Sequence, residues 1–370
     1  MARLRQSCPA GGGAPGGPRP PPGPPRRAAP PPGPGGAGPA PPPRRRRPGG
    51  GGARRAPPGR GGGGPGGGGP PPRGVGTERA VAGLAEIVAR AAADAGLADQ
   101  LAQRSAPLAE HVSACLANCD LPIEEERLTE AIAALGWGRT VNVTNDTFAL
   151  LRSGLPDDGE PTGVAVVCGA GINCAGLAPG GRPARFPAIG RISGDWGGGG
   201  HLADEALWWA ARAWDGRGEP TELASALPGH FGLTDMLALI TALHLGEVAP
   251  TRRYELTPVL FAVADAGDAV ARAIVARQAD EVVTMATVAL AKLDLLGEHA
   301  PVVLGGGVLA ARHRLLDGGV RELLAERAPK ATPHVVQAPP VLGAALLGLD
   351  HIGADRALYE RLRAAYGAAA

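Results

Sequence analysis

The first 74 residues restrict folding more than any other feature of this sequence. They consist almost entirely of Gly, Pro, Ala and Arg, with runs such as Arg44–Arg47. A segment of this kind has too little apolar surface to offset the entropy that a chain loses on becoming ordered. We therefore predict a disordered tail over 1–74 and expect the folded part of the 370-residue chain to begin near residue 75.

Two explanations of this tail stay open. Its 13 arginines and its lack of acidic residues suit a basic arm that binds nucleic acid or a membrane surface. Gly, Pro, Ala and Arg are also the residues encoded by codons made only of G and C, so a GC-rich gene read in a shifted frame gives the same composition. We favour this misread start. An upstream frame encoding an apolar strand and a glycine-rich turn would support it.

The charge of the chain changes at the same place. The sequence has 37 Lys and Arg against 35 Asp and Glu, so residues beyond the tail carry 24 basic and 35 acidic side chains, a net charge of −11. An acidic body argues against a nucleic-acid-binding face. The five cysteines are odd in number and lack CxxC spacing, which indicates reduced thiols in a cytoplasm. Uncharged apolar runs all fall short of the roughly 18 residues that span a membrane.

Strand and helix patterns alternate beyond the tail. Short apolar runs predict strands, and apolar residues at helical spacing predict helices. We expect strands at 111–117, 140–143, 163–168, 301–304 and 334–337, and helices at 78–97, 122–135, 203–215, 219–245, 265–296 and 318–327 and from 341 onward. This is the α/β pattern, in which ligands gather at the carboxyl ends of strands.

Asn145 and Asp146 follow the strand predicted at 140–143. An Asp at a strand end can face a cleft, where its carboxylate could accept a proton from a substrate hydroxyl. The same residue could instead cap the following helix, because Asp is a favoured N-cap. Position alone leaves both interpretations open.

Three glycine-rich segments also follow strands. Gly169–Gly171 would let backbone N–H groups approach phosphate oxygens. The four glycines at 197–200 suit a backbone bent near a ligand or a hinge between lobes. Gly305–Gly307 would let a flat ring lie on the backbone, or simply form a tight turn. The sequence has neither a GxxxxGK[ST] loop nor a GxGxxG motif opening a helix, which argues against P-loop and dinucleotide-binding folds.

The four segments occur in a specific order: Asn-Asp, then Gly-x-Gly-x-Asn-Cys, then Gly-Asp before glycines, then Gly-Gly-Gly after a strand. This order resembles the BadF/BadG/BcrA/BcrD-type ATPase family, and within it the N-acetylglucosamine kinases, which have the actin-like ATPase fold. The resemblance covers about 75–350. It implies a two-lobed, ribonuclease H-like α/β fold with an incomplete N-terminal lobe at 75–160, a nucleotide-binding lobe at 161–350 and a C-terminal helix at 351–370.

The resemblance also implies a role for each matching residue. Asp146 matches the catalytic base. The residues implied to bind the sugar are Asn145, Asn173 and Asp195. Those implied to bind the nucleotide are Gly169, Ala170, Gly171, Gly305, Gly306, Gly307 and Gly343. The implied reaction uses ATP and Mg²⁺ to phosphorylate an amino sugar such as N-acetylglucosamine, and a homodimer is compatible with the family.

Three departures from the family pattern stand out. The family begins with a strand and an Asp-Gly-Gly-Gly-Thr loop that holds the β- and γ-phosphates and helps to place the metal, whereas here the tail occupies that position. Trp196 replaces the usual Glu, and Asn118 replaces the usual Gly. Phosphoryl transfer depends on positioning and charge neutralisation. Because the loop is missing, it is an open question whether the chain as it stands is active.

Two other functions stay open. Dehydratase-activating ATPases of the same family hold an iron–sulfur cluster between subunits with cysteines, and Cys168 and Cys174 flank the glycine loop here. Absorbance in the visible would identify such a protein. The other function is a non-catalytic sugar regulator whose tail binds DNA, although the sequence lacks a helix-turn-helix and the tail lacks aromatic residues.

Overall fold

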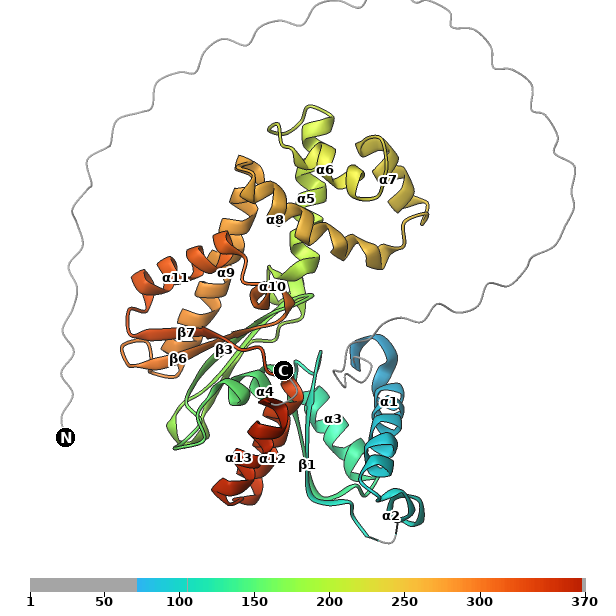
Figure 1. Cartoon of the computed structure of the whole chain (residues 1–370), viewed down its shortest axis with the longest axis vertical. Helices are drawn as coiled ribbons and strands as arrows, with labels where there is room; N and C mark the ends of the chain where they lie inside the picture. The colour runs from blue at the N-terminus through green and yellow to red at the C-terminus, as the bar shows by residue number, and fades with distance from the viewer. Residues whose placement is uncertain (1–71, 105, 368–370) are drawn as a thin grey trace, which may run out of the picture. The chain divides into compact units, whose positions relative to one another are not determined.

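The computed structural model describes residues 72–104 and 106–367, so the tail prediction lies almost entirely outside the described residues (Figure 1). These residues form a two-stranded sheet and a five-stranded sheet with helices packed against both. The predicted α/β class is therefore confirmed. Within the described part, no helix is long and apolar enough to cross a membrane.

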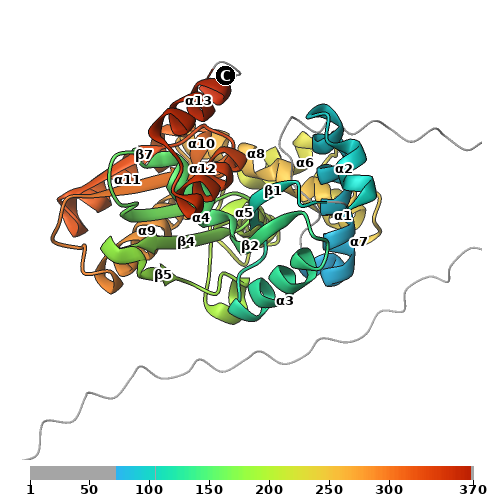
Figure 2. The same ribbon diagram turned by 90° about the horizontal axis from the view of Figure 1, so that it is seen from below.

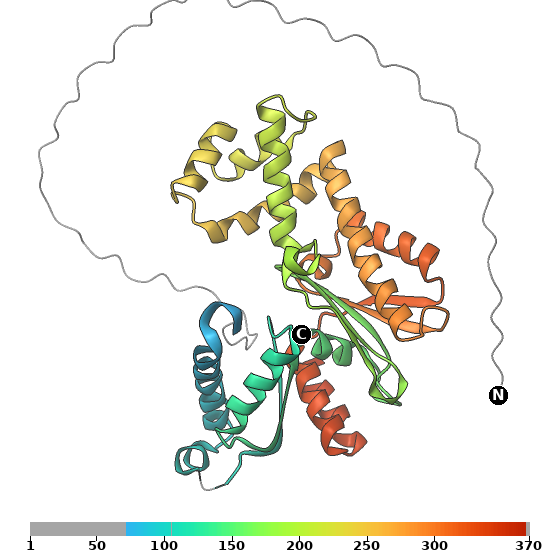
Figure 3. The same cartoon turned by 180° about the vertical axis from the view of Figure 1, so that it is seen from behind.

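The N-terminal lobe is built on the two-stranded sheet. Its elements, in chain order, are α1 (Pro72–Asp94), α2 (Ala98–Gln103), β1 (Ala109–Leu116), α3 (Pro122–Ala133) and β2 (Gly138–Asn145). The strands run parallel, and α1 packs beside α3 (Figure 3). Leu128 and Ile132 of α3 are buried in a small core with Val143 of β2.

The first turn of α3 follows the predicted start signal. Pro122 is its first residue, where the missing N–H of proline is not needed. The Glu124 carboxylate accepts hydrogen bonds from the backbone N–H groups of Asp120 (3.0 Å) and Leu121 (2.9 Å). These bonds hold the turn between β1 and α3, which carries Asp120 toward the end of β2.

We predicted a buried strand at 111–117, and β1 is only half-buried. The reason is that β1 pairs with β2 alone, and the described residues supply no third strand to this sheet. Parallel strands are ordinarily covered on both faces and flanked by further strands.

The C-terminal lobe contains the five-stranded sheet, in the order β5-β4-β3-β6-β7. Its strands are β3 (Gly163–Cys168), β4 (Ile172–Leu177), β5 (Pro183–Arg185), β6 (Ala300–Gly305) and β7 (Ala331–Val335). β3, β6 and β7 run parallel, and β4 and β5 are antiparallel. The predicted strands at 163–168, 301–304 and 334–337 are found, the last of them shifted toward the N-terminus, whereas β4 and β5 were missed.

Alternate side chains of β3 point to two different cores. Val164 and Val166 are buried in the large core that includes α9 (Ala269–Lys292), and Ala165 is buried with Leu150 and Leu151 of α4 (Asp146–Gly154). Because neighbouring side chains of a strand face opposite sides, the sheet lies between α9 and α4. Figure 1 shows α11 (Arg314–Arg327) beside α9.

The remaining helices of this lobe lie beyond the end of the sheet that carries the turn at 169–171. They are α5 (Gly198–Trp214), α6 (Leu223–His230), α7 (Met236–His244), α8 (Leu256–Asp265) and the short α10 (Gly307–Ala310). The long helix predicted at 265–296, whole or broken, is found as α9, with its start shifted. α8 ends at Asp265 and α9 begins at Ala269, because the Asp268 side chain caps α9 by accepting from Ala271 N–H (2.8 Å).

The last two helices, α12 (Pro340–Ile352) and α13 (Arg356–Gly367), return to the N-terminal lobe. α12 packs against α4 and β1 (Figure 2), although the predicted domain boundary placed residues up to 350 in the nucleotide-binding lobe. The contact is close at Gly343, where an added Cβ would lie 1.7 Å from the Ala149 carbonyl oxygen. Glycine at this position lets the two helix backbones touch.

Candidate active site

A buried polar cluster lies where β1 and β2 end and β4 begins. The Asn145 side chain accepts from Thr147 N–H (2.9 Å) and donates to the Asp120 carboxylate (2.9 Å). Asn173 donates to Asn145 Oδ1 (3.1 Å) and to Asp120 (3.2 Å). The structure thus brings together Asn145 and Asn173, two residues predicted to bind the sugar. It adds Asp120, which the sequence analysis missed although Asp120 follows the first strand as Asn145 follows the second.

An ion pair fastens this cluster across the two lobes. Arg185 of β5 donates two hydrogen bonds to the Glu125 carboxylate of α3, at 2.7 and 2.8 Å. Glu125 also accepts from the backbone N–H of Asn145 (3.1 Å). Bidentate pairs of this kind fix direction as well as distance, so the end of β2 is held in place.

Asp146 is the first residue of α4, and the N-cap is Asn145 instead. The capping role that we considered for Asp146 is therefore filled by its neighbour. Burial raises the pKa of the Asp146 carboxyl, while hydrogen bonds from the N–H groups of Asp146 and Thr147 act in the opposite direction. A half-buried carboxyl with a raised pKa beside a polar cluster suits a general base.

The turn at 169–171 joins β3 to β4, as the predicted phosphate loop requires. Gly169 N–H donates to the Gly171 carbonyl (2.9 Å), which closes the turn. An added Cβ on Gly169 or Gly171 would have no neighbour within 4 Å, so the loop borders open space. No described group accepts a hydrogen bond from the N–H groups of Ala170 and Gly171, so these two donors could bind a phosphate.

The glycines at 197–200 are bonded to this loop. Gly199 N–H donates to the Gly169 carbonyl (2.8 Å), and Gly200 N–H donates to the Ala170 carbonyl (2.9 Å). Gly198 N–H donates to Oε1 of Gln278, a fully buried residue of α9 (2.9 Å). We expected the helix to begin near residue 202; α5 begins at Gly198, and its first turn fixes the segment instead of leaving a flexible hinge.

The predicted adenosine turn at 305–307 joins β6 to α10. Gly306 has a φ of +84°, and an added Cβ would lie 2.5 Å from the Cys168 carbonyl carbon. The turn therefore lies directly against the end of β3. Gly307 lines the cavity described below.

Replacing Gly306 with Ala is expected to lower the free energy of unfolding by about 2 kcal/mol, because the new Cβ meets backbone at a positive φ. Gly307→Ala is the matched control, since a Cβ there has no neighbour within 4 Å. Urea unfolding of both variants checks this. Equal stabilities would contradict the expectation.

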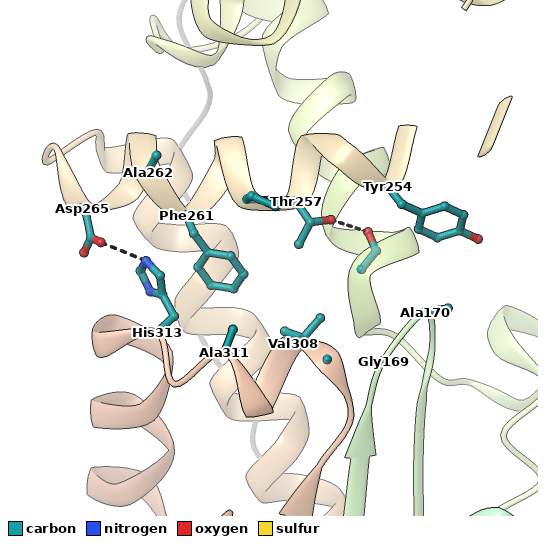
Figure 4. Close-up of a pocket in the computed structure, with 13 residues that line it drawn as sticks. Gly169, Ala170, Tyr254, Thr257, Phe261, Ala262, Asp265, Val308, Ala311 and His313 are labelled. Atoms are coloured by element: carbon teal, nitrogen blue, oxygen red, sulfur yellow. Dashed lines mark hydrogen bonds and ion pairs between the residues drawn. The ribbon is translucent and has the colours of Figure 1, made fainter. Parts of the chain in front are cut away.

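A cavity of about 720 Å³ opens between the phosphate loop, α8 and α10 (Figure 4). Gly169, Ala170 and Gly307, three of the residues predicted to bind the nucleotide, line it, whereas Gly171, Gly305 and Gly306 do not. The sequence analysis missed its other walls, whose residues are Gly199, Tyr254, Thr257, Pro258, Phe261, Ala262, Asp265, Val308, Ala311 and His313. A concave, largely apolar space with a few polar groups is typical of a cofactor site.

Asp195 and Gly343 also lie outside the cavity. The Asp195 carboxylate accepts from the Ser193 hydroxyl and from Gly190 N–H (3.2 Å), so it closes its own loop. Gly343 lies between α12 and α4 and is not among the residues that line the cavity. Their implied roles in binding sugar and nucleotide stay predictions.

The cysteines considered for an iron–sulfur cluster are inaccessible. Cys168 and Cys174 are fully buried, and burial raises the pKa of the Cys168 thiol to about 12. A metal ligand must be a thiolate, and a cluster shared between subunits needs surface cysteines. The positions of these two residues therefore do not favour the dehydratase-activator function.

The described residues form no group of three or more His, Cys, Asp or Glu side chains that could hold a metal ion. Mg²⁺ in kinase sites is commonly held by one or two carboxylates together with substrate phosphates and waters. The protein groups present do not make a magnesium site by themselves, and we assign no step to the ion.

Two solved structures are similar to this chain in fold. A protein assigned as an N-acetylglucosamine kinase from Chromobacterium violaceum has a TM-score of 0.52 and 22% identity, covering 74% of this chain and 85% of that one. A protein with the same assignment from Porphyromonas gingivalis has a TM-score of 0.51 and 19% identity, covering 76% and 88%. They confirm the predicted two-lobed actin-like fold.

Two curated proteins are similar in sequence. N-acetyl-D-glucosamine kinase of Dictyostelium discoideum is 27% identical over 243 residues, which is 64% of this chain and 75% of that protein. N-acetylmuramic acid/N-acetylglucosamine kinase of Clostridium acetobutylicum is 26% identical over 201 residues, 54% of this chain and 65% of that protein. The chain thus spans just under two thirds of the length of the second relative.

A model of the BadF/BadG/BcrA/BcrD ATPase family matches residues 68–348. This match covers well over half of the chain and includes the polar cluster and the turns at 169–171 and 305–307. The chain belongs to the BadF/BadG/BcrA/BcrD ATPase family.

Proposed function

We propose that this protein is an ATP-dependent kinase that phosphorylates an amino sugar such as N-acetylglucosamine. The observation that carries the proposal is that Asp146, the Asn145–Asn173–Asp120 cluster and the loop at 169–171 lie around the junction of the two sheets. A base, a set of hydroxyl-binding groups and a phosphate-binding turn are what phosphoryl transfer to a sugar requires. The two curated relatives, both named as amino-sugar kinases, support the same substrate class.

Each group has a distinct task in this proposal. Asp146, ionised, accepts the proton of the attacking sugar hydroxyl. Asn145, Asn173 and Asp195 hold the sugar, and the amides of Ala170 and Gly171 meet phosphate oxygens. The 720 Å³ cavity holds the nucleoside, with Gly307 in its wall. ATP use follows from the family, and Mg²⁺ would arrive with the nucleotide phosphates.

The missing Asp-Gly-Gly-Gly-Thr loop leads to a specific experiment. ADP release is measured with ATP and a panel of sugars, on the chain as it stands and on a version whose upstream frame supplies the strand and glycine-rich loop. Turnover of N-acetylglucosamine by the restored version alone would support both the kinase proposal and the misread start. If neither version releases ADP with any sugar, the kinase proposal fails.

We also propose a cytoplasmic location. The four cysteines in the described part of the chain, Cys115, Cys119, Cys168 and Cys174, are all free thiols, which suits a reducing compartment. The homodimer stays a prediction.

A further inference from the structure

The cavity beside the phosphate loop has two chemically different ends. At one end lie the backbone of Gly169 and Ala170 and the beginning of α5. At the other end lie the side chains of Asp265 and His313 (Figure 4). The Ala170 N–H has no acceptor among the described residues, so the triphosphate of a nucleotide belongs at the glycine end.

The space between these ends is a slot with apolar walls. Pro258, Phe261 and Ala262 of α8 form one wall, and Val308 and Ala311 form the other. Figure 4 shows Phe261 pointing across the slot toward the wall that carries Ala311. Flat apolar walls suit an aromatic ring.

The slot is long enough to hold a nucleotide that lies along α8. Thr257, beside the phosphate loop, and Asp265 are eight residues apart on α8, which corresponds to about 12 Å at 1.5 Å per residue. Phosphate, ribose and base follow one another along a nucleotide. With phosphate at the glycine end, the edge of the base reaches the Asp265 end.

Asp265 is held in position for such a contact. Its carboxylate is paired with His313 Nε2 at 2.9 Å, and the His313 ring lies against Phe261 at 4.3 Å between centroids. Asp265 Oδ1 is also paired with Arg314 Nη2, at 3.5 Å. The Asp265 side chain is nevertheless 43% exposed, and a carboxylate has about four acceptor sites, so it can accept a further hydrogen bond. Thr257 is a weaker candidate for contacting the base, because its hydroxyl already donates to the Gly199 carbonyl (2.8 Å).

We propose that Asp265 recognises the nucleotide base by accepting a hydrogen bond from an exocyclic amino group, which for ATP is the 6-amino group of adenine. An ionised carboxylate has acceptors only, so its partner on the base has to be a donor. The 6-amino group is the hydrogen-bond donor on the adenine ring system. This inference rests on the proposed nucleotide-binding function of the cavity and assigns its specificity to one residue.

The test compares two ligands on the full chain without sugar. Calorimetry measures the Kd of ADP and of the purine riboside 5′-diphosphate that lacks the 6-amino group. The wild-type protein is expected to bind ADP about tenfold more tightly, as a hydrogen bond to a charged group predicts. Asp265→Ala is expected to bind the two ligands with about equal Kd. Asp265→Asn keeps a carbonyl acceptor and is expected to retain part of the preference for ADP.

Asp280→Ala is the matched control. Asp280 is another half-exposed carboxylate, on α9, paired with Arg327 at 2.6 Å, and it does not line the cavity. This variant is expected to keep the full preference for ADP. A preference that survives in Asp265→Ala, or equal affinities in the wild type, would overturn the inference while leaving the kinase proposal intact. The version with the restored upstream frame is measured alongside, and failure of both versions to bind either ligand would overturn both proposals.

Discussion

Replacing Asp146 with Asn is expected to lower kcat by about 10²–10⁴-fold in the version of the protein that turns over N-acetylglucosamine, with little change in the KM of the sugar. The amide has the shape of the carboxyl but cannot accept the hydroxyl proton. Initial rates against sugar concentration separate the two parameters. A variant that keeps full turnover would contradict the assignment of Asp146 as the base.

The pH dependence of the wild type follows from the same group. Burial raises the pKa of Asp146, and the base must be ionised to act. Activity is therefore expected to fall as the pH drops through this raised pKa, at a higher pH than for an ordinary Asp. The Asn variant should lose this acidic limb of the profile.

Asp146→Asn is expected to raise the stability of the fold although it lowers activity. Since the folded-state pKa of Asp146 is raised, the ionised carboxyl destabilises the fold above that pKa, and this cost disappears as the pH falls through it. Asp146→Asn should therefore be more stable than the wild type at neutral pH. Asp157 is the contrasting control: its hydrogen bond with Arg363 lowers its pKa, so Asp157→Asn should be less stable. Urea unfolding at pH 7 measures both.

Replacing Arg152 with Ala is expected to cost about 3–5 kcal/mol of stability, the range for removing one partner of a buried ion pair. The Arg152 side chain is 3% exposed and donates to Asp157 (2.8 Å) and to Asp350 (2.7 and 3.1 Å). Its loss leaves Asp350 without its arginine partner, while Asp157 keeps only the Arg363 guanidinium. It also separates the end of α4 from α12, which Asp350 belongs to.

Arg327→Ala serves as the comparison for this effect. Arg327 pairs with Asp280 at 2.6 Å, but its side chain is 37% exposed, so the expected cost is about 0–1 kcal/mol. Guanidinium chloride unfolding of both variants provides the measurement. If the Arg152 variant were no less stable than the Arg327 variant, the buried network would not hold the helices together.

Sequence patterns predicted the parts of the fold that local chemistry determines. The strand at 163–168 is a continuous apolar run, and α3 begins at a proline followed by acidic residues, so both were found. β4 was missed because its sequence, Ile-Asn-Cys-Ala-Gly-Leu, continues the glycine loop without a strand-like alternation. The start of α5 was misplaced because Gly198 and Gly199 are poor helix formers, and tertiary bonds to the phosphate loop override that preference.

The candidate site was predicted from order along the chain and completed by geometry. Asn145, Asn173 and Gly169 carry recognisable motifs, and the structure places them around one junction. Asp120 and Asp265 carry none: the first is a single acid after a strand, and the second was placed at the start of the predicted helix at 265–296 but is the last residue of α8. Their positions depend on which elements pack together, and a single sequence does not contain that information in readable form.

The return of α12 to the N-terminal lobe also affects the order in which the protein can fold during synthesis. α12 begins at Pro340 and covers β1, which ends at Leu116, so 223 residues separate the two. At a translation rate of about 5–20 residues per second, β1 waits roughly 10–45 s for its covering helix. During that interval one face of the strand pair stays exposed to other nascent chains and to chaperones, and only the last tenth of the polypeptide closes it.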